Sequence, residues 1–193
     1  MKKNFKLINK KTLHKGFYQL YEYVFKHKKY DGSWSINLSR EIFGGANVVN
    51  VLPYDPIEKK ILLIEQFRAG LIEKKTSPFI KEIVAGVIDN NEKPEQAARR
   101  ECKEETGCKI KKLKKIFSYY PVPGSSQSHY HLFLAEIDSF TGDRILGMKN
   151  EGEDILSKCY TLKEVKKMLD RGNIINGLTI VALQWFFLNY KIK

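Results

Sequence analysis

The sequence lacks several features that would place the protein in a membrane or outside the cell. Its longest apolar stretch, residues 183–188, is interrupted by Gln184 and falls far short of the ~20 residues that a membrane-spanning helix needs. No apolar signal core follows the opening Met1-Lys2-Lys3. The three cysteines among 193 residues have no metal-ligand spacing and are too few for a disulfide framework. We therefore expect a cytoplasmic protein with no membrane partner.

Acidic residues are outnumbered, since 34 Lys and Arg face 22 Asp and Glu and leave a net charge of +12. The lysines are scattered, and the densest run, residues 109–115, is interrupted by Ile110 and Leu113. A lysine-rich solvated surface is the favoured interpretation. An electrostatic field that attracts a polyanionic substrate is a second one. No named nucleic-acid motif is present, so we expect no nucleic-acid partner.

Apolar periodicity and turn residues divide the chain into strands and helices. The predicted strands are residues 17–27, 34–43, 47–52, 61–68, 79–84, 116–120, 130–137 and 156–160. The predicted helices are residues 94–106, 161 to about 172, and 178–190, the last apolar nearly all round and expected to be well buried. Strands before and between helices predict a mixed α/β layer fold.

Three glutamates are stacked within about one turn of the first predicted helix. Glu101, Glu104 and Glu105 share a face, where like charges repel by ~0.2–0.5 kcal/mol per pair. A solvated acidic face is one explanation. The other is a site for hard divalent cations, because Mg²⁺ prefers oxygen ligands and often bridges carboxylates to substrate phosphates.

The residues around these glutamates favour the metal site. The pattern is Gly86, five residues, Glu92, seven residues, Arg100-Glu101-Cys102, one residue, Glu104-Glu105, one residue, Gly107-Cys108. It resembles the Nudix box with every polar and glycine position filled. Cys102 and Cys108 stand where aliphatic residues are usual, and cysteine packs as a small apolar residue.

The resemblance implies a role for each residue of the box. It makes Glu101, Glu105 and the carbonyl of Ala85 ligands of Mg²⁺, for which Mn²⁺ may substitute. It places Glu104 on the same face in a catalytic role, with Arg100 and Glu92 orienting the others. The implied fold is the Nudix-type α/β/α sandwich with a mixed sheet.

The resemblance extends along nearly the whole chain to the ADP-ribose pyrophosphatase branch of this family. It rests on residues 64–68, 82–86, 123–124 and 180–185, and Pro123 stands about fifteen residues past the box, as is typical of the branch. The branch implies two domains: an N-terminal β-hairpin region over residues 1–45 that is swapped in a homodimer, and a hydrolase domain over residues 46–193.

A polar loop over residues 139–154 is expected to complete the site. Gly142, Gly147 and Gly152 would permit a mobile lid. By resemblance, Glu151 is the general base and Glu153 a further metal ligand. A plain polar surface loop is the alternative.

Substrate contacts are also implied by resemblance. The residues are Phe17, Tyr18, Arg40, Glu41, Arg68 and Val87, of which Phe17 would stack on adenine and the two arginines would grip nucleotide and phosphates. Hairpin packing for Phe17 and a surface position for Arg40 are the structural alternatives. Ser128 stands where many members of the branch have glutamate, so another nucleotide sugar stays open as the substrate.

These observations predict Mg²⁺-dependent hydrolysis of ADP-ribose to AMP and ribose 5-phosphate. The alternatives are a hydrolase of a GDP-sugar or UDP-sugar and a non-catalytic nucleotide sensor.

Overall fold

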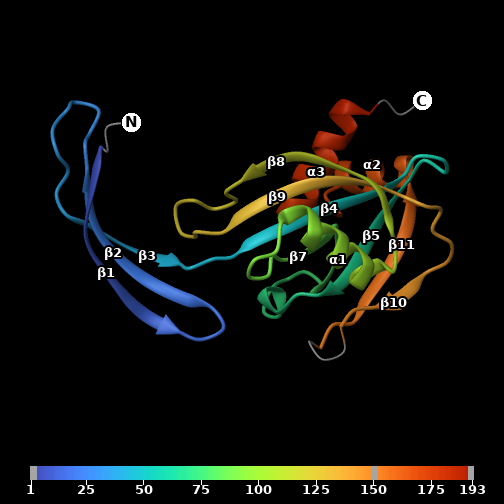
Figure 1. Ribbon diagram of the computed structural model, residues 1–193, viewed down its shortest axis with the longest axis horizontal. Coiled ribbons are helices and arrows are strands. Elements are labelled where there is room, and N and C mark those ends of the chain that lie inside the picture. The colour runs from blue at the N-terminus through green and yellow to red at the C-terminus, as the bar shows by residue number, and fades with distance from the viewer. Residues whose placement is uncertain (1–3, 149–151, 191–193) are drawn as a thin grey trace. The chain divides into compact units, whose positions relative to one another are not determined.

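The computed structural model describes residues 4–148 and 152–190, which divide into two compact units (Figure 1). Unit 1 comprises residues 1–47 and 119–130, and unit 2 comprises residues 48–118 and 131–193. The segment 119–130 therefore packs with the N-terminal region, although it lies far along the chain. Among the described residues, no helix is both long and apolar enough to cross a membrane.

Unit 1 is built on a three-stranded antiparallel sheet in the order β1-β2-β3. The strands are β1 (Phe5–Lys15), β2 (Gln19–His27) and β3 (Leu38–Phe43). The predicted turn at residues 30–32 is present, because the backbone N–H and hydroxyl of Ser33 donate to Asp31 Oδ1 at 2.8 and 2.6 Å. The predicted hairpin was incomplete: β1 was not foreseen, and β3 begins at Leu38 rather than at residue 34.

Unit 2 is built around an eight-stranded sheet in the order β10-β11-β5-β4-β9-β8, with β6 paired to β5 and β7 to β4. Its elements are β4 (Asn47–Asp55), β5 (Lys60–Phe67), η1 (Ala69–Leu71), β6 (Phe79–Glu82), β7 (Val84–Val87), α1 (Pro94–Thr106), β8 (Ile110–Tyr119), β9 (His129–Ile137), β10 (Arg144–Leu146), β11 (Ile155–Thr161), α2 (Leu162–Asp170) and α3 (Gly177–Asn189). At their ends, β4, β8 and β9 run a residue or two into unit 1.

Helices cover both faces of this sheet (Figure 1). Ala98 and Cys102 of α1 pack in one buried cluster with Val49 and Val51 of β4. The ring of Tyr54, an even-numbered residue of the same strand, contacts Phe186 of α3. Because successive side chains of a strand point to opposite faces, α1 and α3 lie on opposite sides of the sheet. The predicted α/β/α layering is confirmed.

The helix ends follow their predicted signals. Pro94 opens α1, and Gly107 ends it in the left-handed region at φ 69°. At the start of α2, Thr161 accepts from the backbone of Glu164, whose carboxylate accepts in return from Thr161 N. Both helices therefore begin where local sequence predicted.

Helix α3 corrects one prediction. Its face containing Leu183 and Phe186 is buried, but Leu188 is 86% exposed and Val181 36% exposed. An apolar composition all round therefore did not make the helix buried all round, because only one side of it meets the sheet.

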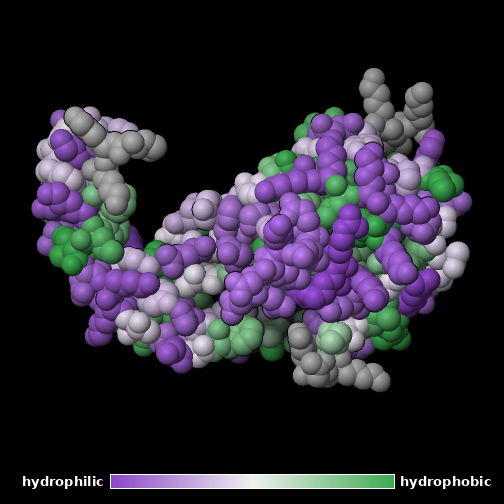
Figure 2. Space-filling view, viewed as in Figure 1, coloured by the Kyte–Doolittle hydropathy of each residue, from purple (hydrophilic) through white to green (hydrophobic). Residues whose placement is uncertain are grey.

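The basic run 109–115 lies in β8 from Ile110 onward, and this strand is longer than predicted. Lys111 pairs with Asp138, and Lys112 lies 3.4 Å from Glu136. Figure 2 shows hydrophilic side chains over most of the visible face of unit 2. The lysines thus form a solvated, partly ion-paired surface, as favoured from sequence. The predicted loop 139–154 also contains a short strand, β10.

Candidate active site on helix α1

The stacked glutamates of α1 face the strand that carries Ala85 and Gly86. Glu105 is only 2% exposed, and its Oε2 accepts a hydrogen bond from Ala85 N at 3.2 Å. The Glu105 carbonyl accepts from the hydroxyl of Ser157 in β11 at 2.6 Å. Backbone and side chain of Glu105 are therefore both fixed by strands of the sheet, and Glu105 does not lie on a solvated face.

Gly86 provides the room for Glu101. A Cβ atom built at Gly86 would lie 1.9 Å from the carboxyl carbon of Glu101 and 2.0 Å from its Oε1. No side chain fits there unless Glu101 moves. The glycine at this position of the sequence pattern thus has a steric reason, namely close approach of a helix carboxylate to the strand backbone.

Arg100 binds the carboxylates around it. Its Nη1 donates to Glu101 at 2.6 Å and to Glu104 at 3.1 Å, and its Nε and Nη2 donate to Glu92 at 3.0 and 2.9 Å. Nη2 also donates to the carbonyl of Val87 at 3.0 Å. Arg100 and Glu92 are therefore in direct contact, and the bond from Arg100 to Val87 connects the helix to β7.

The carboxylates of the site repel one another. Burial raises the pKa of Glu105 well above its usual range, and the charges of Glu101 and Glu153 raise it further. Burial likewise raises the pKa of Glu101, against the hydrogen bond from Arg100. By contrast, the hydrogen bond from Arg100 lowers the pKa of Glu92. The buried Glu105 and the half-buried Glu101 both resist ionisation here, which a bound cation would reverse.

The donor set fits a hard divalent cation such as Mg²⁺. It consists of carboxylate oxygens and a strand carbonyl, with no sulfur or imidazole. Within residues 4–148 and 152–190, no three acidic, histidine or cysteine side chains are already gathered as a metal-binding group. Glu101 is bonded to Arg100, and Glu153 accepts from Met148 N at 2.9 Å. A cation would compete with these hydrogen bonds.

The structure brings Ala85, Val87, Arg100 and the three helix glutamates together. Arg68, just after β5, is within electrostatic range of Glu105, whose pKa it lowers. Glu153 follows Gly152, and its charge acts on both Glu101 and Glu105. Glu151, the expected general base, lies outside the described residues.

The remaining substrate-binding predictions fall in unit 1. Phe17 and Tyr18 lie between β1 and β2, 94% and 64% exposed, with their rings in edge contact at 4.8 Å. Arg40 and Glu41 are exposed residues of β3. Hairpin packing does not bury Phe17, so the structural alternative for that residue is weakened.

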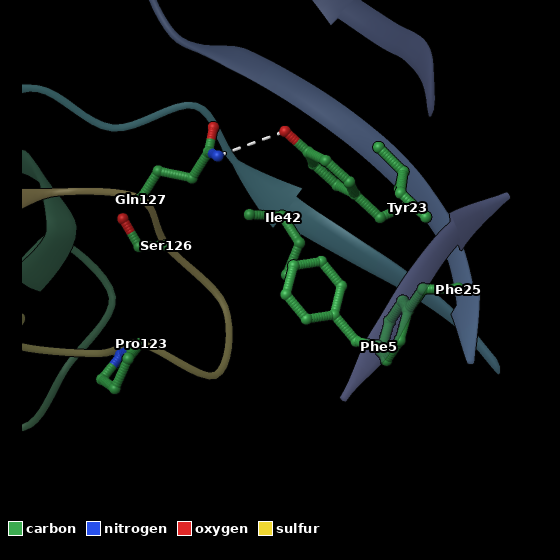
Figure 3. Close-up of a pocket in the computed structure, with 8 residues that line it drawn as sticks. Phe5, Tyr23, Phe25, Ile42, Pro123, Ser126 and Gln127 are labelled. Carbon is green, nitrogen blue, oxygen red and sulfur yellow. Dashed lines mark hydrogen bonds between the residues drawn. The ribbon is translucent and has the colours of Figure 1, made fainter. Parts of the chain in front are cut away.

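Unit 1 also contains an apolar hollow of about 320 Å³ (Figure 3). Phe5, Phe25 and Ile42 line it from the three strands. Gln127 Nε2 donates to the hydroxyl of Tyr23 at 3.1 Å along one wall. None of its eight lining residues is charged, so this hollow offers no carboxylate for a hard cation.

Sequence patterns assign no role to Glu82, a buried carboxylate at the end of β6. Its Oε2 accepts from Arg68 Nε at 2.7 Å. The available signal was an acidic residue next to the apolar run Ile83-Val84 of a predicted strand, three residues before Ala85. Buried charges of this kind are rare unless they are paired.

Known proteins resemble this chain over nearly its full length. The sequence model of the NUDIX domain matches residues 45–178. An ADP-ribose pyrophosphatase of Escherichia coli strain K12 is 33% identical over 190 residues, covering 98% of this chain and 91% of that protein. One from Haemophilus influenzae is 35% identical over 187 residues, covering 95% and 86%.

Two further comparisons are more distant. A GDP-mannose pyrophosphatase of Shigella dysenteriae is 29% identical over 188 residues, covering 96% of each chain. A crystal structure described as an ADP compounds hydrolase superposes with a TM-score of 0.72 at 17% identity, covering 98% of this chain and 97% of that one, which shows the shared fold. The box residues, the fold and the relatives agree, and the chain belongs to the Nudix family.

Proposed function

We propose that this protein hydrolyses the diphosphate of ADP-ribose to AMP and ribose 5-phosphate in a Mg²⁺-dependent reaction. The observation that carries the proposal is a pair of carboxylates, the buried Glu105 and the half-buried Glu101, held against Ala85 and Gly86. Their raised pKa values mark a place that favours a positive charge. Relatives of 33% and 35% identity named ADP-ribose pyrophosphatase support the choice of substrate.

Four groups would hold the metal: the carboxylates of Glu101, Glu105 and Glu153 and the carbonyl of Ala85. Mn²⁺ would serve in place of Mg²⁺, since both accept oxygen ligands. When bound, the cation neutralises charge on the diphosphate and lowers the pKa of a bound water.

The other residues of the box act through their contacts. Arg100 fixes the directions of Glu101 and Glu104 and is itself fixed by Glu92. Glu104, with a half-buried carboxylate on the same face, takes part in catalysis beside the metal ligands. Arg68 would bind the substrate's phosphates and the backbone at Val87 its nucleotide.

Glu151 would accept the proton of the attacking water. In the sequence it lies two residues before Glu153, between β10 and β11. Glu151→Gln should lower kcat far more than it raises KM, because it removes a base and leaves the binding groups in place. An unchanged kcat would remove Glu151 from this role.

The active assembly would be a domain-swapped homodimer, in which Phe17, Tyr18, Arg40 and Glu41 bind substrate at the partner's site. Two exposed aromatic side chains beside each other support an interface at the end of this hairpin. Mixing inactive Glu105→Gln and Arg40→Ala subunits tests the arrangement. Exchange between chains would restore part of the activity, whereas binding within one chain would leave the mixture inactive.

Two other functions stay open. A GDP-sugar substrate is favoured by the 29% relative and by Ser128, whose hydroxyl accepts from the hydroxyl of Ser126 at 3.0 Å. A non-catalytic sensor has less support, since every glutamate of the box is present. Localisation in the reducing cytoplasm is supported by the three cysteines, which form no disulfide.

The decisive experiment is a hydrolysis panel with purified protein and Mg²⁺. It compares ADP-ribose, GDP-mannose, UDP-glucose, NADH and diadenosine polyphosphates, with Glu105→Gln as the control. AMP and ribose 5-phosphate released fastest from ADP-ribose would support the proposal. Preference for GDP-mannose would keep the metal site and change the substrate, and no turnover of any compound would favour the sensor.

A further inference from the structure

Glu82 is a buried acid that the proposed reaction does not use. Its side chain is 4% exposed and accepts three hydrogen bonds: from Arg68 Nε at 2.7 Å, from Gln66 Nε2 at 3.3 Å and from Asn176 Nδ2 at 2.5 Å. A buried carboxylate is costly unless it is paired and hydrogen-bonded, and this one is both. Such a well-satisfied group is suited to holding a partner in one orientation.

The partner with access to solvent is Arg68. Its side chain is 42% exposed, and its charge reaches Glu105 in the carboxylate site. In the described part of the chain, Glu82 engages Arg68 through Nε only. The two terminal nitrogens, which form the fork that binds phosphate, are therefore left to a ligand.

A third element fixes Glu82 in turn. Asn176 is the N-cap of α3, and its Oδ1 accepts from Thr179 N at 2.9 Å while its Nδ2 donates to Glu82. The hydroxyl of Thr179 accepts from Ile83 N at 3.0 Å. The first turn of α3 thus holds the two residues, Glu82 and Ile83, that lead into the strand of the metal site.

We propose that Glu82 is a positioning residue that sets the guanidinium of Arg68 for the substrate's diphosphate, and that Asn176 holds Glu82 in place from the start of α3. This inference rests on the proposed function. It predicts that loss of the Glu82 charge acts on ligand binding through Arg68. An arginine that must be ordered on binding loses affinity relative to one already oriented.

The test is a double-mutant cycle on binding rather than on turnover. The α,β-methylene analogue of ADP-ribose, which cannot be hydrolysed at the diphosphate, is titrated calorimetrically in Mg²⁺. We expect Glu82→Gln to weaken binding about 10-fold and Arg68→Ala about 50-fold, with the double variant no weaker than Arg68→Ala alone. In turnover of ADP-ribose, Glu82→Gln should raise KM by a similar factor and leave kcat within about 3-fold.

Glu65→Gln is the matched control. Glu65 lies on the same strand pair, and its carboxylate accepts from Lys81 at 2.6 Å rather than from an arginine of the site. It should bind the analogue as wild type does. If Glu65→Gln weakens binding as much as Glu82→Gln, the effect belongs to strand stability and the inference is wrong.

A second variant covers the case in which Glu82→Gln unfolds. Asn176→Ser keeps a good helix cap and removes only the donor to Glu82, so it should fold and weaken binding about 3-fold. Wild-type affinity in both Glu82→Gln and Asn176→Ser, or losses at Glu82 and Arg68 that multiply, would overturn the inference alone. Failure of the wild-type protein both to bind the analogue and to hydrolyse ADP-ribose would overturn the proposed function and this inference with it.

Discussion

The strands of the two units are stabilised in different ways. All eleven residues of β1 in unit 1 are exposed, whereas six of the nine residues of β4 in unit 2 are buried. In unit 1, lysines lie over aromatic rings at the surface, as Lys10 does over Tyr21 at 3.8 Å and Lys6 over Trp34 at 5.2 Å. In unit 2, a buried cluster from several strands and α1 supplies the packing.

This difference indicates that the two units have different functions. Unit 2 can hold carboxylates that repel one another, because the packing of its buried core around α1 compensates for the repulsion. The exposed unit keeps apolar side chains such as Phe17 in solvent, where they are available to bind. Changes in the core and at the carboxylates of unit 2 should therefore affect stability or chemistry, whereas changes at the exposed tip of unit 1 should affect binding alone.

The largest expected effect is loss of turnover in Glu105→Gln. Removing one metal-binding charge should cost several kcal/mol of transition-state stabilisation, or about 10³-fold in kcat. The fold should remain, because glutamine keeps the shape and an acceptor for Ala85 N. Circular dichroism and steady-state kinetics measure the two parts. A wild-type rate would remove Glu105 from the metal site.

Next comes a pair of phenylalanine truncations that compares the units directly. Phe133→Ala empties a fully buried position and should lower the free energy of unfolding by ~3–5 kcal/mol. Phe17→Ala removes a side chain that is 94% exposed and should change stability by less than ~0.5 kcal/mol while raising KM. Urea unfolding measures the free energy of unfolding of both variants, and steady-state kinetics measures KM. Equal losses of free energy of unfolding in the two variants would contradict the difference between the units.

Gly86→Ala separates chemistry from stability within unit 2. The added Cβ would displace the Glu101 carboxyl, which is the end of a flexible side chain, so the protein should still fold. Displacing a ligand of the site should lower kcat by about 10²-fold. Thermal unfolding and kinetics are compared with Gly70→Ala, where a Cβ meets nothing within 4 Å. Full activity in Gly86→Ala would show that Glu101 need not stay where it lies.

The smallest effect is a pH dependence of stability without metal. Because the pKa of Glu105 is raised in the folded protein, the folded state holds this proton more tightly than the unfolded state does. Its contribution is full below the unfolded pKa of ~4.3 and is lost as pH rises through the folded pKa.

The measurement compares the Tm of wild type and Glu105→Gln in EDTA from pH 5 to 9. The Tm of the variant should exceed that of wild type increasingly as pH rises, by about 2–4 °C for each kcal/mol. Mg²⁺ should narrow the gap, since it stabilises the ionised carboxylate. A gap that stays constant with pH would show that Glu105 titrates normally in the folded protein.

Local patterns predicted the helix of the site well and the strands of unit 1 poorly. The ends of α1 depend on Pro94 and Gly107, which act within one turn. β1 was missed because its lysines alternate irregularly with Phe5, Leu7 and Leu13, and no face of it is buried. Strand prediction relies on burial of one face, which this strand lacks.

The features of the site likewise divide into those that local sequence predicted and those that only the structure showed. The spacing of Glu101, Glu104 and Glu105 placed them on one helix face, because helical periodicity is a property of neighbouring residues. The roles of Glu151 and Glu153 remain predictions by resemblance. The steric need for Gly86 became visible only when α1 and β7 were seen together.

By itself, the sequence determined the family, the helix that carries the carboxylates and the oxygen-rich character of the site. Each follows from residue types at short separations, where chain geometry allows few arrangements. Only the tertiary structure decided which glutamates are buried and which face of α3 is exposed. It also decided that Glu82 contacts both Arg68 and Asn176, the latter 94 residues beyond Glu82 in the chain. Contacts at that separation depend on how sheet and helices pack, because no local rule brings such residues together.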